Sequence, residues 1–140
     1  MRGGEELADL AWICHPGGVA ERDLLAAGCR QALGPDVELT AHFHNTRGQG
    51  LANVLAALEQ GIDSFESSFG ELGGCPVPPG ATGNVATEDL VSMLHEMGIE
   101  TGIALDRLLE AARAVREVLG RPLGSHVLTA GPVDWHDPGR

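Results

Sequence analysis

The chain has 140 residues, which suits one domain, and its twenty acidic and nine basic side chains give a net charge of −11. This charge repels phosphates, so we expect neither nucleic acid nor an anionic membrane surface as a partner. No apolar run is long enough to span a membrane. Three cysteines, an odd number without paired spacing, predict reduced thiols and a cytoplasmic setting.

In chain order, short apolar runs alternate with amphipathic stretches. Each of three short runs predicts a buried strand with a helical stretch after it, and one more helix follows. The predicted strands are 7–13, 37–42 and 62–68, and the predicted helices are 21–33, 51–61, 87–97 and 105–119. Strands that alternate with helices indicate a parallel α/β arrangement. After Gly120, glycines and prolines predict an irregular tail.

The second predicted strand ends in a His-x-His pair. Successive side chains on a strand point to opposite faces, so His42 and His44 project to one side and Phe43 to the other. Two imidazoles spaced in this way can take adjacent positions on one cation, and with oxygen ligands they suit Mg, Mn, Fe or Zn. The pattern does not exclude two ordinary histidines without a metal.

A loop of nearly twenty residues, rich in Gly and Pro, follows the third predicted strand. Loops of this length are uncommon in compact domains unless they are functional or disordered. This one carries Cys75 next to Gly73 and Gly74, where the backbone can approach a ligand closely. It closes on Asn84, whose amide oxygen is a plausible hard ligand. The alternative for Cys75 is a buried, inert thiol.

The helix predicted after this loop has recognisable start signals. Thr87 is a suitable N-cap, and Glu88 and Asp89 fall in the first turn, where the helix dipole favours acids. His95 lies between the apolar positions, so we expect it at the surface. The apolar stripe is predicted to consist of Leu90, Met93, Leu94 and Met97.

Three motifs together resemble the 3-hydroxy-3-methylglutaryl-CoA lyase family, within the superfamily of metal-dependent lyases and Claisen-condensing enzymes built on a TIM barrel. The Gly-Gly-Cys-Pro loop is the specific part, because the condensing synthases carry a Gly-Glu-Arg type loop there. The resemblance continues to about Pro122. The motifs are His42-Phe43-His44-Asn45-Thr46, Leu72-Gly73-Gly74-Cys75-Pro76 and Gly83-Asn84-Val85-Ala86-Thr87-Glu88.

The resemblance implies a fold and a metal site. The fold would be the C-terminal part of a TIM (β/α)8 barrel, with about three parallel strands and flanking helices over residues 1–122, followed by an irregular tail over residues 123–140. The metal, Mg or Mn, would bind through His42, His44 and Asn84. It would act as a Lewis acid while hydroxymethylglutaryl-CoA, or a similar 3-hydroxyacyl-CoA, is cleaved to acetyl-CoA and acetoacetate.

The resemblance also assigns roles within the long loop. Cys75 would transfer a proton to the carbanion left by carbon–carbon cleavage, on a loop hinged by Gly73 and Gly74. Glu88 would support the loop through hydrogen bonds, although its place in the first helical turn already explains an acid there.

Two features of the family pattern are absent from this chain. In the family the strand corresponding to 7–13 ends in Asp-Thr, whereas this chain has Cys14-His15 there. These residues could form an altered turn or a second metal site. The family's first strand carries an Arg-Asp pair that completes the metal site and assists catalysis, and nothing in these residues matches it. We therefore expect the chain alone to lack lyase activity. As protein partners we expect either a second copy of the chain, in a homo-oligomer, or a complementing N-terminal half. The expected substrate is an acyl-CoA.

Two hypotheses from other functional classes stay open. The chain could be an inactive remnant with a role in assembly. It could also be a small zinc protein that uses His42, His44 and Cys75, because zinc favours nitrogen and sulfur ligands.

Overall fold

The computed structural model describes residues 10–14, 27–74, 80 and 82–133, and its three strands form a parallel sheet, as predicted. Strands β1 (Leu10–Cys14), β2 (Glu38–His42) and β3 (Ser64–Glu66) lie in the order β1-β2-β3. In this register Cys14 pairs with His42, and His42 pairs with Glu66. The carboxyl ends of all three strands therefore meet at one edge of the sheet, where parallel α/β folds gather their active-site residues.

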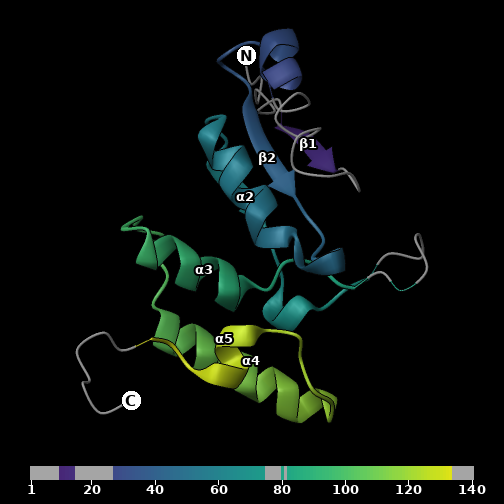
Figure 1. Cartoon of the computed structure of the whole chain (residues 1–140), viewed down its shortest axis with the longest axis vertical. Helices are drawn as coiled ribbons and strands as arrows, with labels where there is room; N and C mark the ends of the chain where they lie inside the picture. Colours follow the sequence, from purple (N-terminus) through teal and green to yellow (C-terminus); the bar gives the residue numbers. More distant parts are fainter. Residues whose placement is uncertain (1–9, 15–26, 75–79, 81, 134–140) are drawn as a thin grey trace, which may run out of the picture.

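Helices flank the sheet and extend the molecule away from it. Residues 27–33 are helical, and the further helices are α2 (Gly50–Glu59), α3 (Thr87–Glu96), α4 (Leu105–Leu119) and α5 (His126–Ala130). Single 3-10 turns, η1 (Thr46–Gly48) and η2 (Phe69–Glu71), follow β2 and β3. Helix α3 lies between the end of the molecule that holds β1, β2 and α2 and the end that holds α4 and α5 (Figure 1).

The main core lies between β2 and the helices α2 and α3. Leu39 and Ala41 are 2% and 0% exposed and share this core with Phe43, so the odd-numbered residues of this segment face the helices. The other buried members are Val54, Ala57, Ile62, Val85, Leu90 and Leu94. Because side chains alternate along a strand, His42 is directed to the opposite face of the sheet, away from the helices.

Helix α3 departs from the sequence prediction at both ends. Ala86, not Thr87, is the N-cap residue, and the Thr87 hydroxyl instead pairs with the Ser67 hydroxyl at 2.9 Å. The predicted cap is wrong because this tertiary hydrogen bond occupies the hydroxyl. Met97 is 46% exposed because the helix ends at Glu96, whereas the rest of the predicted stripe lies in or against the core.

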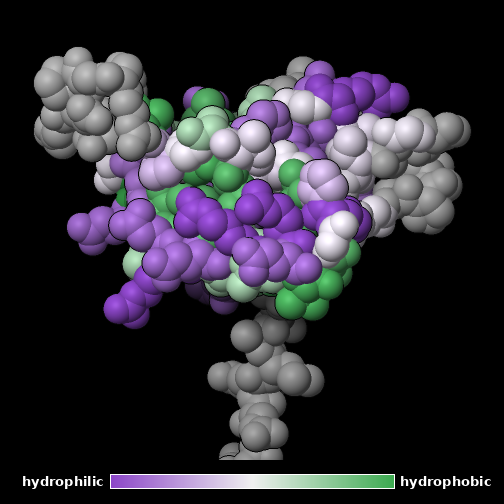
Figure 2. Space-filling model, turned by 90° about the horizontal axis from the view of Figure 1, so that it is seen from below, coloured by the Kyte–Doolittle hydropathy of each residue, from purple (hydrophilic) through white to green (hydrophobic). Residues whose placement is uncertain are grey.

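Helix α4 has the predicted bounds and presents a charged face to solvent. Leu109 and Ala112 are 2% and 0% exposed and face inward. Its exposed charged residues include Asp106, Glu110, Arg113 and Arg116. In the view from below, hydrophilic side chains cross the middle of the molecular surface and apolar ones gather in separate places (Figure 2). Within the described residues, no helix combines the length and apolar character needed to cross a membrane.

The expectation of an irregular tail is wrong for His126–Ala130, which form α5. Leu128 of α5 is 7% exposed and packs with Leu109 and Ala112 in a second core cluster. Phe69 of η2 and Leu123 pack against the same cluster. The segment after Gly120 is thus part of the packed structure as far as α5, while residues 134–140 lie outside the described part of the chain.

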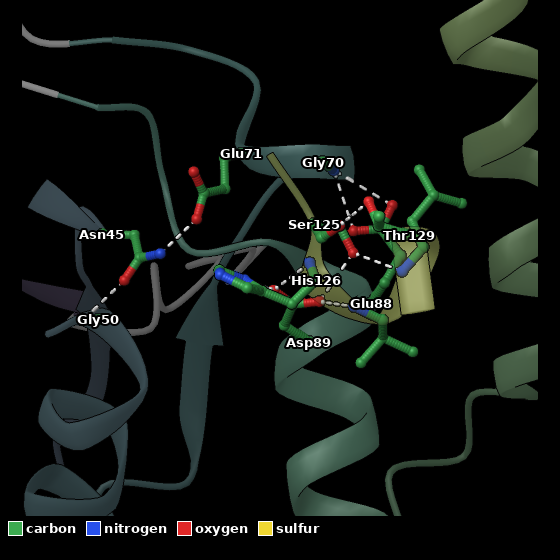
Figure 3. Close-up of polar contacts among 11 residues, drawn as sticks. Asn45, Gly50, Gly70, Glu71, Glu88, Asp89, Ser125, His126 and Thr129 are labelled. Atoms are coloured by element: carbon green, nitrogen blue, oxygen red, sulfur yellow. Dashed lines mark hydrogen bonds and ion pairs between the residues drawn. The ribbon is translucent and has the colours of Figure 1, made fainter. Parts of the chain in front are cut away.

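A carboxylate of α3 explains why such a short helix forms. Asp89, 5% exposed, accepts hydrogen bonds from the backbone N–H groups of His126 (3.0 Å) and Val127 (2.8 Å) and from the Ser125 hydroxyl (2.7 Å; Figure 3). The Ser125 oxygen in turn accepts from Leu128 N–H at 3.0 Å, as an N-cap does. The Ser125 cap is local, but the Asp89 acceptor that holds Ser125 lies 36 positions earlier, so no local pattern could predict that support.

Candidate metal centre

The structure brings the predicted histidine pair together at the carboxyl end of β2. His42 is its last residue and His44 follows two positions later, with ring centroids 5.2 Å apart and ring planes at 62°. Phe43, between them, is 3% exposed in the main core. The two rings therefore project to one side and Phe43 to the other, as the strand geometry predicts.

His42 is oriented by a carboxylate from the neighbouring strand. Its Nδ1 lies 3.0 Å from Glu66 Oε2, and Glu66 is its register partner at the end of β3. An Nδ1–H that donates to a carboxylate leaves Nε2 as the nitrogen that can bind a ligand, which is how metal-binding histidines are commonly held. Glu66 was not among the predicted site residues, although parallel pairing of the strand ends could have pointed to it.

The surroundings of His44 favour its neutral form. Burial, and then the positive charge that His42 can carry, lower the pKa of His44 from its ordinary value of 6.5. A metal-bound imidazole must be neutral, so this environment favours the ligand form near neutral pH.

Asn84 lies beside the histidines through backbone pairing. His44 and Asn84 form an antiparallel bridge, flanked by hydrogen bonds of 3.0 Å from Val85 N–H to the Phe43 carbonyl and from Asn45 N–H to the Gly83 carbonyl. The Asn84 side-chain Nδ2 donates to the Leu72 carbonyl at 2.9 Å. This contact fixes the amide and turns its oxygen, the predicted ligand atom, away from Leu72.

Gly73 and Gly74 of the loop differ in whether the surrounding structure leaves space for a side chain. Gly73 has φ +105°, and a Cβ there would come within 2.7 Å of Asn84 Nδ2, so a side chain would displace the amide. Gly74 is exposed, and nothing lies within 4 Å of where its Cβ would be. Cys75 lies outside the described residues, and its predicted role stays a prediction.

Glu88 makes the contact that a supporting role in this loop requires. Its buried carboxylate accepts the N–H of Gly70 in η2, at 3.1 Å and 2.9 Å to its two oxygens. Burial raises the pKa of Glu88 from its ordinary value, and the nearby Asp89 charge adds to this, while the Gly70 hydrogen bond opposes it. Whether Glu88 serves catalysis stays a prediction.

Imidazole nitrogens and an amide oxygen are donor types that divalent cations accept, but three donors do not complete the coordination of such a cation. The His42 and His44 rings lie 5.2 Å apart, and Asn84 pairs with His44 through the backbone. Hydrogen bonds engage Nδ1 of His42 and Nδ2 of Asn84, which leaves His42 Nε2 and the Asn84 amide oxygen available to a cation. Among the described residues, no group of three or more His, Cys, Asp and Glu side chains could hold a metal. His15 and the Cys14 side chain lie outside the description, so the second metal site considered there is not tested.

Comparisons with known proteins identify the family of the chain. The HMGL-like family model matches residues 8–115. The chain belongs to the HMGL-like family. It is 48% identical over 118 residues to the (R)-citramalyl-CoA lyase of Chloroflexus aurantiacus, covering 83% of this chain and 37% of that protein. It is 50% identical over 94 residues to the hydroxymethylglutaryl-CoA lyase YngG of Bacillus subtilis, covering 67% of this chain and 31% of that one.

A solved member of the family shows the same fold. An HMG-CoA lyase from Acinetobacter baumannii, in complex with coenzyme A and 3-methylmalate, superposes with a TM-score of 0.79 at 43% identity, over 87% of this chain and 40% of that one. The fold is thus part of a TIM barrel, with three parallel strands and flanking helices, as predicted. The chain spans less than two-fifths of these two curated lyases.

Proposed function

We propose that this member of the HMGL-like family serves as part of a metal-dependent carbon–carbon lyase for hydroxymethylglutaryl-CoA or a similar 3-hydroxyacyl-CoA. The observation that carries the proposal is the pairing of the adjacent His42 and His44 rings with Asn84 on the neighbouring backbone, with His42 oriented by Glu66 and the Asn84 amide by Leu72. The names of the related lyases support an acyl-CoA substrate. A cytoplasmic setting, expected from the cysteines, remains part of the proposal.

A divalent cation, Mg or Mn, would be held by the two imidazoles and the Asn84 amide oxygen. It would polarise the hydroxyl and carbonyl oxygens of the substrate as a Lewis acid. Oxygen ligands suit both ions, and a set with only three protein donors leaves positions for the substrate and for an acid from a complementing N-terminal half.

Cys75 would complete the reaction. Loss of the substrate hydroxyl proton and cleavage of the adjacent carbon–carbon bond yield the ketone acetoacetate and the enolate of acetyl-CoA. The Cys75 thiol would give its proton to that enolate carbon and be reprotonated afterwards. Gly73, two residues before Cys75 in the sequence, permits the loop backbone to pass close to Asn84.

Citramalyl-CoA is a second candidate substrate. The (R)-citramalyl-CoA lyase of Chloroflexus aurantiacus aligns over a larger share of this chain than the Bacillus lyase does, at nearly equal identity. Both substrates are 3-hydroxyacyl-CoA esters that the same cleavage chemistry can break, so the choice between them is one for direct assay.

The test measures turnover of both substrates with Mn²⁺. The chain is assayed alone and mixed with the part of the Bacillus lyase that it does not cover. We expect no turnover alone, as an isolated chain or a homo-oligomer, and measurable turnover in the mixture that His42→Ala abolishes. His95→Ala is the matched control, because His95 is exposed and pairs with Thr101 on the α3–α4 loop.

Three results would contradict the proposal. Turnover that survives His42→Ala would remove the metal centre from the mechanism. Tight zinc at one ion per chain, lost in Cys75→Ser, would favour the zinc protein. A mixture that assembles and binds Mn²⁺ but turns over neither substrate would favour the inactive remnant.

A further inference from the structure

Two consecutive residues of η2 adopt left-handed backbone conformations. Gly70 has φ +51° and Glu71 has φ +62°. Glycine tolerates this region, but a residue with a Cβ pays about 1 kcal/mol or more to occupy it. In the described part of the chain, Arg47 and Glu71 are the non-glycine residues with positive φ. Something in the surroundings therefore compensates for the strain at Glu71.

The Glu71 side chain is held by Asn45, which lies next to the histidine pair. Asn45 Nδ2 donates to Glu71 Oε1 in a short hydrogen bond (Figure 3). The amide oxygen of Asn45 accepts from Gly50 N–H at 3.0 Å, at the start of α2. Because its oxygen already serves α2, the Asn45 amide can present only its nitrogen to Glu71. The pair is thus specific in direction, with Asn45 as donor and Glu71 as acceptor.

Neighbouring segments enclose Glu71 on two further sides. A Cβ on Gly83 would lie 1.7 Å from the Glu71 carbonyl oxygen, and a Cβ on Gly124 would lie 2.4 Å from Glu71 Oε2. Gly124 N–H also donates to the Gly70 carbonyl at 2.9 Å. The backbone of Glu71 is therefore packed directly against the residue that precedes Asn84.

The residue after Glu71 makes the link to the predicted ligand. The Leu72 carbonyl accepts the hydrogen bond from Asn84 Nδ2, which orients the Asn84 amide. A change in the position of Glu71 moves Leu72 on one side and Gly83 on the other. Both movements reach Asn84.

We propose that the Asn45–Glu71 hydrogen bond is a clamp that positions the Asn84 amide oxygen beside His44 for the cation. The inference rests on the proposed function, because Asn84 matters there as a metal ligand. Glu71 and Asn45 are positioning residues in this proposal, and they act through Leu72 and Gly83. Glu71 keeps a strained conformation because the clamp needs its carboxylate at that place.

The direction of the hydrogen bond supplies a rescue experiment. Asn45→Asp sets two carboxylates against each other while keeping the acceptor for Gly50. Glu71→Gln keeps an acceptor for Asn45. In the double variant Asn45→Asp/Glu71→Gln, the new glutamine amide donates to the new aspartate, so the bond is restored with donor and acceptor exchanged.

Glu71→Gly separates positioning from stability. Glycine adopts φ +62° without strain, so this variant should unfold at the same temperature as the wild type or higher. The clamp is nevertheless lost. If the contact served stability alone, its loss in Glu71→Gly would not weaken cation binding, because this variant is at least as stable as the wild type.

The experiment measures Mn²⁺ affinity of the chain by electron paramagnetic resonance and follows the Asn84 side-chain amide by NMR. We expect Asn45→Asp and Glu71→Gly to weaken Mn²⁺ binding by about tenfold, within the range found when groups supporting metal ligands are lost. Glu71→Gln and the double variant should stay within about twofold of the wild type. Glu100→Gln, on the exposed α3–α4 loop, is the control acid.

The two readouts separate failure of the clamp from failure of the metal centre. If the wild-type chain binds no Mn²⁺, or binds it equally well as His42→Ala, the proposed metal centre is wrong, and the NMR signal alone decides on the clamp. That signal should shift in Asn45→Asp and return in the double variant. An Asn84 signal that does not move in Asn45→Asp, or a double variant no better than Asn45→Asp, overturns the clamp.

Discussion

Asp89→Ala should cost a large part of the stability of the C-terminal half of the described structure. The carboxylate is 5% exposed and accepts two backbone N–H groups and the Ser125 hydroxyl at 2.7–3.0 Å. Leaving the His126 and Val127 N–H groups without this acceptor should cost about 1–2 kcal/mol, as the loss of a helix cap does. Leaving the Ser125 hydroxyl, itself 1% exposed, without its acceptor adds about 1–2 kcal/mol. We therefore expect the free energy of unfolding to fall by about 2–4 kcal/mol.

Urea unfolding followed by circular dichroism measures this loss, and hydrogen exchange locates it. Asp89→Asn keeps an acceptor oxygen and should lose about half as much. Asp106→Ala removes an exposed first-turn acid of α4 and should cost less than about 1 kcal/mol. Protection of the Val127 and Leu128 amides should fall most in Asp89→Ala. If Asp89→Ala were no less stable than Asp106→Ala, the capping explanation of α5 would be refuted.

Three further predictions concern the candidate site. Glu66→Ala should weaken Mn²⁺ binding about 10–100-fold because His42 loses its orienting carboxylate. The control Glu59→Ala on α2 should leave the Mn²⁺ affinity measured by titration calorimetry unchanged. Cys75→Ser should abolish turnover in the complemented mixture yet keep Mn²⁺ affinity, and loss of both would make the thiol a ligand. Burial raises the pKa of Glu88, so protonation of its carboxyl stabilises the folded chain below pH 4.5, and this stabilisation is lost as the pH rises through the folded pKa. The melting temperature of Glu88→Gln, measured against pH, should lack this loss.

The parts of the fold that follow from local periodicity could be predicted from the sequence. Alternation along β2 fixes the common side of His42 and His44 and the buried position of Phe43. Apolar spacing predicts a helix over about 105–119, and α4 spans Leu105–Leu119. These features depend on residues that are close to one another in the sequence, and so the sequence pattern predicts them.

The contacts that orient the site could not be predicted in this way. Glu66 meets His42 across 24 positions, and Glu71 meets Asn45 across 26. Each pair depends on strand register or on a strained turn, which amphipathic patterns do not encode. The tail prediction failed for a related reason, because Asp89 on another helix accepts the first N–H groups of α5 and the hydroxyl of its N-cap, Ser125.

The first turn of α3 shows how much a local explanation can leave out. The helix dipole accounts for two consecutive acids there, but it would act equally on exposed carboxylates. Glu88 and Asp89 are both buried, and each reaches a different segment: Glu88 holds the Gly70 N–H of η2, and Asp89 holds the start of α5. Gly124, just before α5, donates back to Gly70. The turn that positions Asn84 is therefore fixed by α3 from one side and by the C-terminal segment from the other, which places that segment in the scaffold of the candidate metal centre.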